Sequence, residues 1–142
     1  QTLMANSDTV KAITANLAAI LAGLGFKIED LSVDPSMTTT PVCVILYEGE
    51  DFEYGHGQKP LYNEVKYLLK ILLNDPKPGT SRDKYTQYVH AIREALTVDA
   101  LNTVGLAGLK LVSLVNTADV AITYEPPVST IDYRMNIRYR EV

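Results

Sequence analysis

The stretch from Tyr133 to Arg140 reads Tyr-Arg-Met-Asn-Ile-Arg-Tyr-Arg, and it decides the fold class of the chain. Apolar and polar side chains alternate along it without a break. Because successive residues of a β-strand point to opposite faces, the pattern predicts a two-faced strand. The buried face would carry Tyr133, Met135, Ile137 and Tyr139. The solvent-exposed face would carry Arg134, Asn136, Arg138 and Arg140.

Other segments show related strand patterns. The stretch from Val42 to Tyr47 is rich in β-branched and apolar residues at both its odd-numbered and its even-numbered positions, which is typical of a central strand. Glu64 to Leu73 alternates strictly and therefore favours a strand, although Leu and Lys are good helix formers. Residues 109–115 and 120–124 predict two further strands, and Phe26 to Val33 predicts a short, weaker one.

Two segments have the apolar spacing of amphipathic helices. The first spans residues 8–24, with N-cap residues around Asp8 and a stop at Gly25. The second spans residues 81–96 and follows a sequence that resembles a capping box. The order helix, strands, helix, strands predicts an α+β fold. We expect two helices packed on one face of a mainly antiparallel sheet of about five to six strands.

The length of 142 residues favours a single domain over residues 1–142. Glycines at 49, 55 and 57 and Pro60 predict a flexible loop near residues 49–62. The net charge of −4 offers no general attraction to nucleic-acid phosphates. We expect no membrane partner, because no apolar run approaches the ~20 residues of a membrane span and the N-terminus lacks a signal-peptide pattern.

The residues that usually carry chemistry are few and scattered. Cys43 is the only cysteine, which excludes an internal disulfide, and its apolar neighbours predict burial. His56 and His90 are too few for a zinc site of three or four ligands, and we expect a loop histidine and a polar-face helix histidine. A Ser-His-Asp triad need not be adjacent in sequence, but no nucleophile elbow is present. We therefore expect no enzyme activity, catalytic residue, cofactor or metal.

Two groups of charged residues are candidates for a contact surface. The acidic group could be a solvated strand end or bind a cation, but calcium loops need carboxylates at fixed offsets around a turn. The arginines are either solvated or form a docking surface, because Arg forks well onto carboxylates. We predict that the acids of one copy face the arginines of the next, head to tail. The predicted interface residues are Glu48, Glu50, Asp51, Glu53, Arg134, Arg138 and Arg140.

The order and pattern of these elements resemble the tail terminator proteins of long-tailed bacteriophages and the cap proteins of contractile tails. The resemblance rests on the helix Val10–Leu24, the strand Pro41–Glu48, the strand and helix within Val65–Leu96, and the closing strand that ends in Ile137–Glu141. It implies a small α+β subunit without catalysis or cofactor. Such subunits form a ring, usually a hexamer, that caps the tail tube, stops its polymerisation and meets the head.

The partners implied by the resemblance are further copies of the chain, the tail-tube protein and a head-completion or connector protein. DNA would pass through the ring without sequence readout. The implied location is the head-proximal end of the tail in the virion, and the host cytoplasm during assembly. Two other interpretations stay open. One is a head–tail connector or tail-tube subunit, and the other is a small-molecule-binding α+β domain or enzyme.

Overall fold

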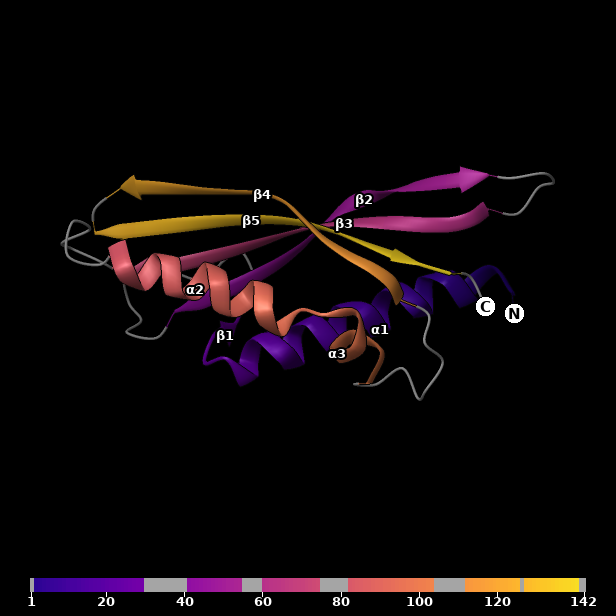
Figure 1. The fold of residues 1–142 in the computed structure, drawn as a ribbon, viewed down its shortest axis with the longest axis horizontal. Helices are drawn as coiled ribbons and strands as arrows, with labels where there is room; N and C mark the ends of the chain where they lie inside the picture. Colours follow the sequence, from indigo (N-terminus) through magenta and orange to yellow (C-terminus); the bar gives the residue numbers. More distant parts are fainter. Residues whose placement is uncertain are drawn as a thin grey trace.

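The computed structural model describes residues 2–29, 41–54, 60–74, 82–103, 112–125 and 127–140. The helices in this part are α1 (Thr2–Gly23), α2 (Arg82–Ala95) and α3 (Val98–Thr103). The strands are β1 (Lys27–Ile28), β2 (Val42–Tyr54), β3 (Pro60–Asn74), β4 (Val112–Glu125) and β5 (Val128–Tyr139). The strands form one twisted sheet, and all three helices lie on the same side of it (Figure 1).

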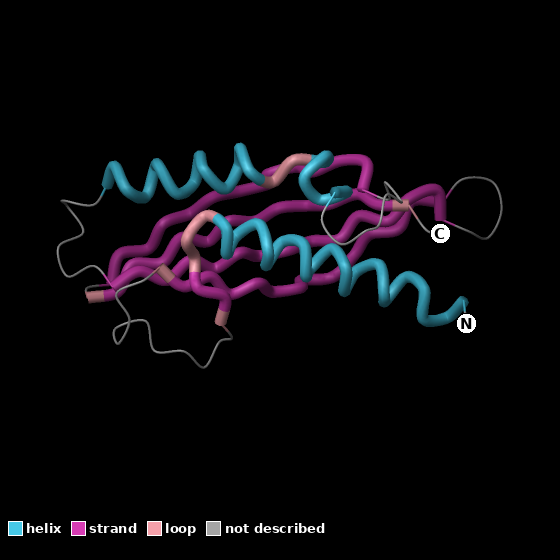
Figure 2. The backbone as a smooth tube through the Cα atoms, turned by 90° about the horizontal axis from the view of Figure 1, so that it is seen from below, coloured by secondary structure: helices cyan, strands magenta, loops and turns pink. Residues whose placement is uncertain are grey.

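The sheet has the strand order β1-β2-β3-β5-β4. The short β1 pairs parallel to β2, whereas the pairs β2–β3, β3–β5 and β5–β4 are antiparallel. Figure 2 shows α1 and α2 lying along the sheet. We call the side that they cover the helix face and the opposite side the outer face. The α+β class, the mainly antiparallel sheet and the placement of both predicted helices on one face are confirmed.

The connection from α1 to the sheet is a helix stop with a defined geometry. Gly25 has a φ of 100°, which is a left-handed conformation that favours glycine. Its amide donates to the carbonyl of Ala22, and the amide of Phe26 donates to the carbonyl of Leu21. These two bonds form a Schellman motif, and buried Phe26 supplies the apolar contact that accompanies it. Gly25 was the stop predicted from the sequence.

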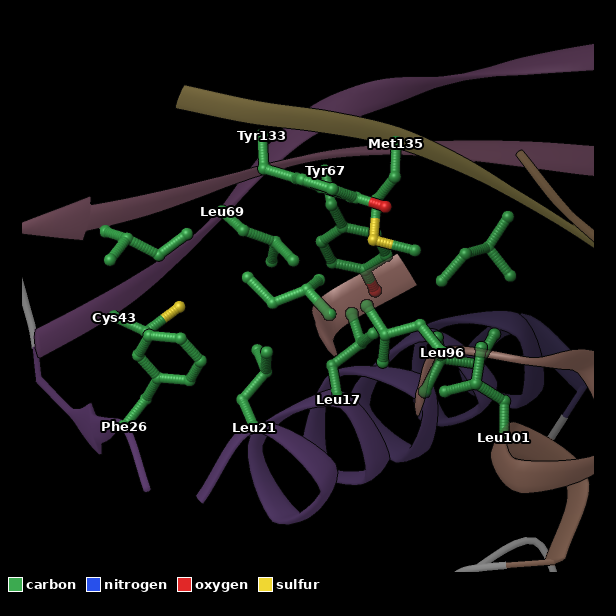
Figure 3. Close-up of a cluster of buried hydrophobic side chains, with 14 of the residues drawn as sticks. Leu17, Leu21, Phe26, Cys43, Tyr67, Leu69, Leu96, Leu101, Tyr133 and Met135 are labelled. Atoms are coloured by element: carbon green, nitrogen blue, oxygen red, sulfur yellow. The ribbon is translucent and has the colours of Figure 1, made fainter. Parts of the chain in front are cut away.

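One apolar core fills the space between the helices and the sheet (Figure 3). Helix α1 contributes the buried Leu17 and Leu21, and α3 contributes Leu101. The core-facing positions of β3 and β5 alternate strictly with outer positions, as the sequence predicted for both strands. The buried apolar residues of these strands on the helix face are Val65, Tyr67, Leu69, Ile71, Leu73, Ile131, Tyr133, Met135, Ile137 and Tyr139, and Leu68 is buried on the outer face.

Buried tyrosines are a distinctive part of this core, and each places its hydroxyl on a polar partner. Such pairing is required because a buried hydroxyl without a hydrogen bond is costly. The partners come from helices and strands alike, so the tyrosines join the two layers. The pairs are Tyr67 with Thr14 at 2.8 Å, Tyr85 with Ser129 at 3.0 Å, Tyr133 with Thr117 at 2.6 Å and Tyr139 with Glu50 at 2.5 Å.

Several predicted boundaries need correction. Helix α1 begins at Thr2 rather than near residue 8, because the residues before Asp8 continue the helix. The two strands predicted at 109–115 and 120–124 are one strand, β4, with an irregularity between Thr117 and Asp119. The weak strand predicted from Phe26 is reduced to Lys27–Ile28, and residues 30–33 lie outside the described part. Helix α3 was not predicted.

The acidic end of β2 also differs from the prediction. Residues 49–54 continue β2 and residues 60–62 begin β3, so the loop predicted near 49–62 is shorter. Its remaining residues, 55–59, lie outside the described part. Strand β2 is only partly central, because β1 pairs with Val42 and Cys43 alone. Long-range pairing with β3 extends the strand through the acidic residues despite their low strand propensity.

Candidate functional site: the outer face and the groove beside β4

Charged side chains cover much of the outer face. Arg134 of β5 lies between two acids of the same chain, with its Nε 3.7 Å from Glu48 and its Nη1 3.9 Å from Asp119. Glu48 belongs to β2 and Asp119 to β4, so one arginine joins three strands. The arginine is 43% exposed, and such pairs contribute only about 0–1 kcal/mol each.

Further along β5, Arg138 has two partners on β3. Its Nη2 lies 3.8 Å from Glu64, and its guanidinium carbon lies 3.9 Å from the ring centre of Tyr62. The first contact is an ion pair and the second a cation–π contact. Arg140 is exposed at the end of the strand, and no ion pair joins it to a described residue. The two faces predicted for the closing strand are therefore confirmed.

Lysines of β3 complete the charge pattern of this face. Lys66 lies 3.0 Å from Asp51 of β2, and Lys70 lies 3.9 Å from Asp132 of β5. Towards β1 the same face is apolar, and Val42 and Val44 are buried there. The outer face is thus a surface on which charges of opposite sign are already paired within one chain.

The predicted acidic group is divided between the two faces. Glu48 and Asp51 lie on the outer face, where each contacts a cation. Glu50 lies on the helix face, level with Val65, and accepts hydrogen bonds from Tyr47 at 2.7 Å and Tyr139 at 2.5 Å. The side chain of Glu53 lies outside the described part.

A bulge causes this division. Tyr47 pairs with Tyr67 and Gly49 pairs with Lys66, which leaves Glu48 as an extra residue in β2. One extra residue reverses the alternation beyond it. Gly49 has a φ of 115°, a conformation that side chains rarely adopt. Sequence alternation alone would have placed Glu48 and Glu50 on the same face.

The phenols around Glu50 have raised pKa values. A hydrogen bond to Glu50 is the largest cause for Tyr47, whose pKa rises to about 12. Burial is the largest cause for Tyr139, whose pKa also lies well above its usual value. Both phenols therefore stay protonated at neutral pH and act as donors to the carboxylate.

A groove of about 540 Å³ lies between the helices and β4. Its helical wall includes Val89, His90 and Arg93 of α2, and its sheet wall includes Val115 and Val120 of β4. His90 and Arg93 are both exposed, as the sequence predicted for His90 on a polar helix face. No pattern in the sequence indicates this groove. Its helical and strand walls are far apart in the chain, and the sequence pattern predicts two strands where β4 is one.

Neither surface assembles a recognisable reaction centre from the described residues. Cys43 is buried, and burial raises the pKa of its thiol to about 12, so it is a poor nucleophile near neutral pH. Within the described ranges, no group of three or more His, Cys, Asp and Glu residues is arranged to hold a metal ion. Among the described helices, none has both the length and the apolar composition of a membrane span.

No protein-family model and no curated protein matches this chain.

Proposed function

We propose that this protein is a structural virion-assembly subunit, a ring-forming tail terminator that caps the tail tube and provides the surface that joins the head. The observation that carries the proposal is the form of the polar surface. Charged residues spread over β2, β3, β5 and β4 on one face instead of converging in a cleft. Broad polar surfaces of this kind suit contact between proteins, whereas reactions usually need a concave site.

The proposal also draws on the resemblance in element order. Apart from the short β1 and α3, the described elements follow the order helix, strand pair, helix and strand pair, which is the order on which the resemblance rests. In the ring, usually a hexamer, the partners would be neighbouring copies, the tail-tube protein and a head-completion or connector protein. DNA would pass through the opening without sequence readout. The subunit would act in the virion at the head-proximal end of the tail, after assembly in the host cytoplasm.

The test combines assembly with function. Light scattering after size-exclusion chromatography should give the mass of a closed oligomer, and electron microscopy should show rings. Added to growing tail tubes of the phage that encodes it, the protein should bind tube ends and stop elongation. Incorporation along the whole tube would instead identify a tail-tube subunit, and binding to heads without capping would identify a connector. Tail-tube and tape-measure genes next to its own gene would support the assignment.

The groove beside β4 favours a second candidate, a small-molecule-binding α+β domain. Its volume of about 540 Å³ falls within the usual range for ligand sites, and it combines apolar walls with His90 and Arg93. This candidate predicts a strict monomer whose thermal stability rises on addition of a small anionic ligand. A ring that gains no stability from small anions would exclude it.

A further inference from the structure

Strand β4 forms one edge of the sheet. It pairs with β5 on one side, and no described strand pairs with its other edge (Figure 1). It is 14 residues long and contains no Lys, Arg or Pro. Protected edge strands are usually short or carry lysine or proline, because an open edge invites pairing with another chain. Bulges also protect edges, and β4 has register shifts at two places, between Val112 and Leu114 and between Thr117 and Asp119. An edge of this length and composition is suited to pairing with another strand.

Strand β2 offers a second open edge of different character. Because β1 covers only Val42 and Cys43, the edge is open from Val44 to Tyr54 among the described strands. Two large apolar side chains of this segment are exposed on the helix face, Tyr47 at 54% and Phe52 at 48%. Glu50 lies between them on the same face, and no described cation forms an ion pair with it.

The two edges have directions that allow them to join. Because the pairs β2–β3, β3–β5 and β5–β4 are all antiparallel, the chain runs in the same direction in β2 and β5. In β4 it runs in the opposite direction. Rotation about an axis along the strands preserves these directions. The β4 of one copy therefore meets the β2 of the next in antiparallel orientation, and both helix faces lie on the same side. Such a contact between unlike edges is heterologous and can close into a ring.

The side chains of the two edges are also complementary. Beside β4, the groove presents Arg93 and His90, and neither forms an ion pair with a described acid. Beyond the groove, Ile122 and Tyr124 of β4 are exposed on the helix face. The β2 edge therefore presents an acid, Glu50, between two exposed aromatic residues. The β4 edge presents a basic groove next to exposed apolar residues, and the two arrangements are complementary.

We propose that β4 of one copy adds to the open edge of β2 in a second copy, and that Glu50 of the second copy then lies at the groove beside Arg93 and His90. This inference rests on the proposed ring. Because β1 blocks Val42 and Cys43, β4 must be displaced along β2 towards Tyr54. A displacement of about four residues is the kind of stagger that closing a sheet requires.

With this displacement of about four residues, the register of the sheet defines which residues of β4 in one copy lie opposite which residues of β2 in the next copy. Ile122 lies opposite Tyr47, and Val120, which lines the groove, lies opposite Glu50. On the outer face, Asp119 comes near Asp51, but Arg134 and Lys66 already neutralise these two acids. The joined edges therefore bury apolar surface on one side and add no unpaired charge on the other.

The experiment compares variants of each edge by light scattering of the full-length chain across a concentration series. Ile122→Lys places a charge on the helix face of β4, and Ile122→Val is its control because it keeps a β-branched apolar side chain at the same position. Phe52→Lys blocks the β2 edge. Arg93→Glu tests the groove, with Lys84→Glu as the control on the exposed part of the same helix. Circular dichroism checks that each variant is folded.

We expect Ile122→Lys, Phe52→Lys and Arg93→Glu each to weaken association by at least about tenfold, whereas both controls associate normally. Mixing Ile122→Lys with Phe52→Lys should give a heterodimer, because each variant keeps the edge that the other lacks. Normal rings from folded Ile122→Lys and Arg93→Glu would overturn the inference while the ring itself stands. A Phe52→Lys homodimer would also overturn it, because it would show pairing of β4 with β4.

The two proposals fail in different ways. If the wild-type protein forms rings through these edges but does not stop tube elongation, the strand addition stands and the tail terminator function fails. If the wild-type protein stays monomeric at high concentration, the strand addition is overturned. A monomer that nevertheless caps tubes would leave the terminator role without this mode of assembly.

Discussion

Tyr139 of β5 donates a hydrogen bond of 2.5 Å to Glu50 of β2, across the intervening strand β3. Tyr47 donates to the other carboxylate oxygen at 2.7 Å. One carboxylate thus links two strands that are not neighbours in the sheet. The two donors differ in environment, because Tyr139 is 1% exposed and Tyr47 is 54% exposed.

This difference predicts unequal losses when each hydroxyl is removed. Tyr139→Phe should lower the free energy of unfolding by about 1.5–3 kcal/mol, since it removes a buried hydrogen bond to a charged group. Tyr47→Phe should cost about 0–1 kcal/mol, because water replaces the exposed phenol. Urea unfolding of the two variants provides a matched comparison. Equal losses of unfolding free energy in the two variants would mean that the buried hydrogen bond from Tyr139 to Glu50 contributes no more than the exposed one from Tyr47.

A second prediction concerns stability at high pH. Burial is the largest cause of the raised pKa of Tyr67, which lies at about 12, above the ordinary tyrosine value of 10.0. The folded state favours the neutral phenol, so this stabilisation is complete below the unfolded pKa and is lost as pH rises from about 10 to 12. The loss should reach about 1–3 kcal/mol.

The measurement is urea unfolding between pH 9 and about 12, where the free energy of unfolding of the wild-type protein should fall as pH rises. Tyr67→Phe should show a smaller slope over that window, because one of the titrating groups is absent. Tyr47 and Tyr139 also have raised pKa values and will leave a residual slope. If Tyr67→Phe retains the full wild-type slope, Tyr67 does not contribute to the pH dependence.

Cys43 should be unreactive in the folded protein. Its thiol is buried in the core, and burial raises its pKa to about 12. At pH 8 the raised pKa alone lowers the thiolate fraction by a factor on the order of a thousand. A thiol-specific reagent should therefore label the protein only as it unfolds, with a rate that follows urea concentration. Rapid labelling without urea would show that the β2 edge opens in the native state.

The sequence predicted features that depend on a repeating pattern. The alternation from Tyr133 to Tyr139 fixed the two faces of β5, and Gly25 marked the end of α1. Features that depend on a single residue in a tertiary context were missed. The extra Glu48 moves Glu50 to the helix face, and no periodicity shows where a bulge will occur.

Helix α3 illustrates the same limit. Thr97 accepts a hydrogen bond from the amide of Ala100, which is ordinary capping chemistry and a signal that sequence reading could have used. The other end depends on a distant residue, because the buried amide of Asn16 donates to the carbonyl of Leu101 at 2.8 Å. A six-residue helix that is secured from α1 has too little pattern of its own to be predicted.

The contacts of Arg134 give the last prediction, which concerns the charged outer face. Because Arg134 contacts Glu48 and Asp119 of its own chain, Arg134→Glu would bring three acids together and should lower stability by about 1–2 kcal/mol. Adding Glu48→Arg in the same chain should restore an opposite-charge pair and recover part of the loss. Thermal unfolding in low salt measures this recovery, and high salt should reduce it.

Assembly assays of the same variants decide whether these charges also act between copies. We expect the double reversal of Arg134→Glu with Arg138→Glu to disturb contacts of the ring or of its head-facing side. Unchanged rings at low salt together with normal head joining would remove both arginines from the interface. Rings that form normally but fail to join heads would place them on the head-facing surface. If a mixture of Arg134→Glu chains and Glu48→Arg chains assembles better than either variant alone, the pairing runs between copies; recovery only within one chain would confine it to the subunit.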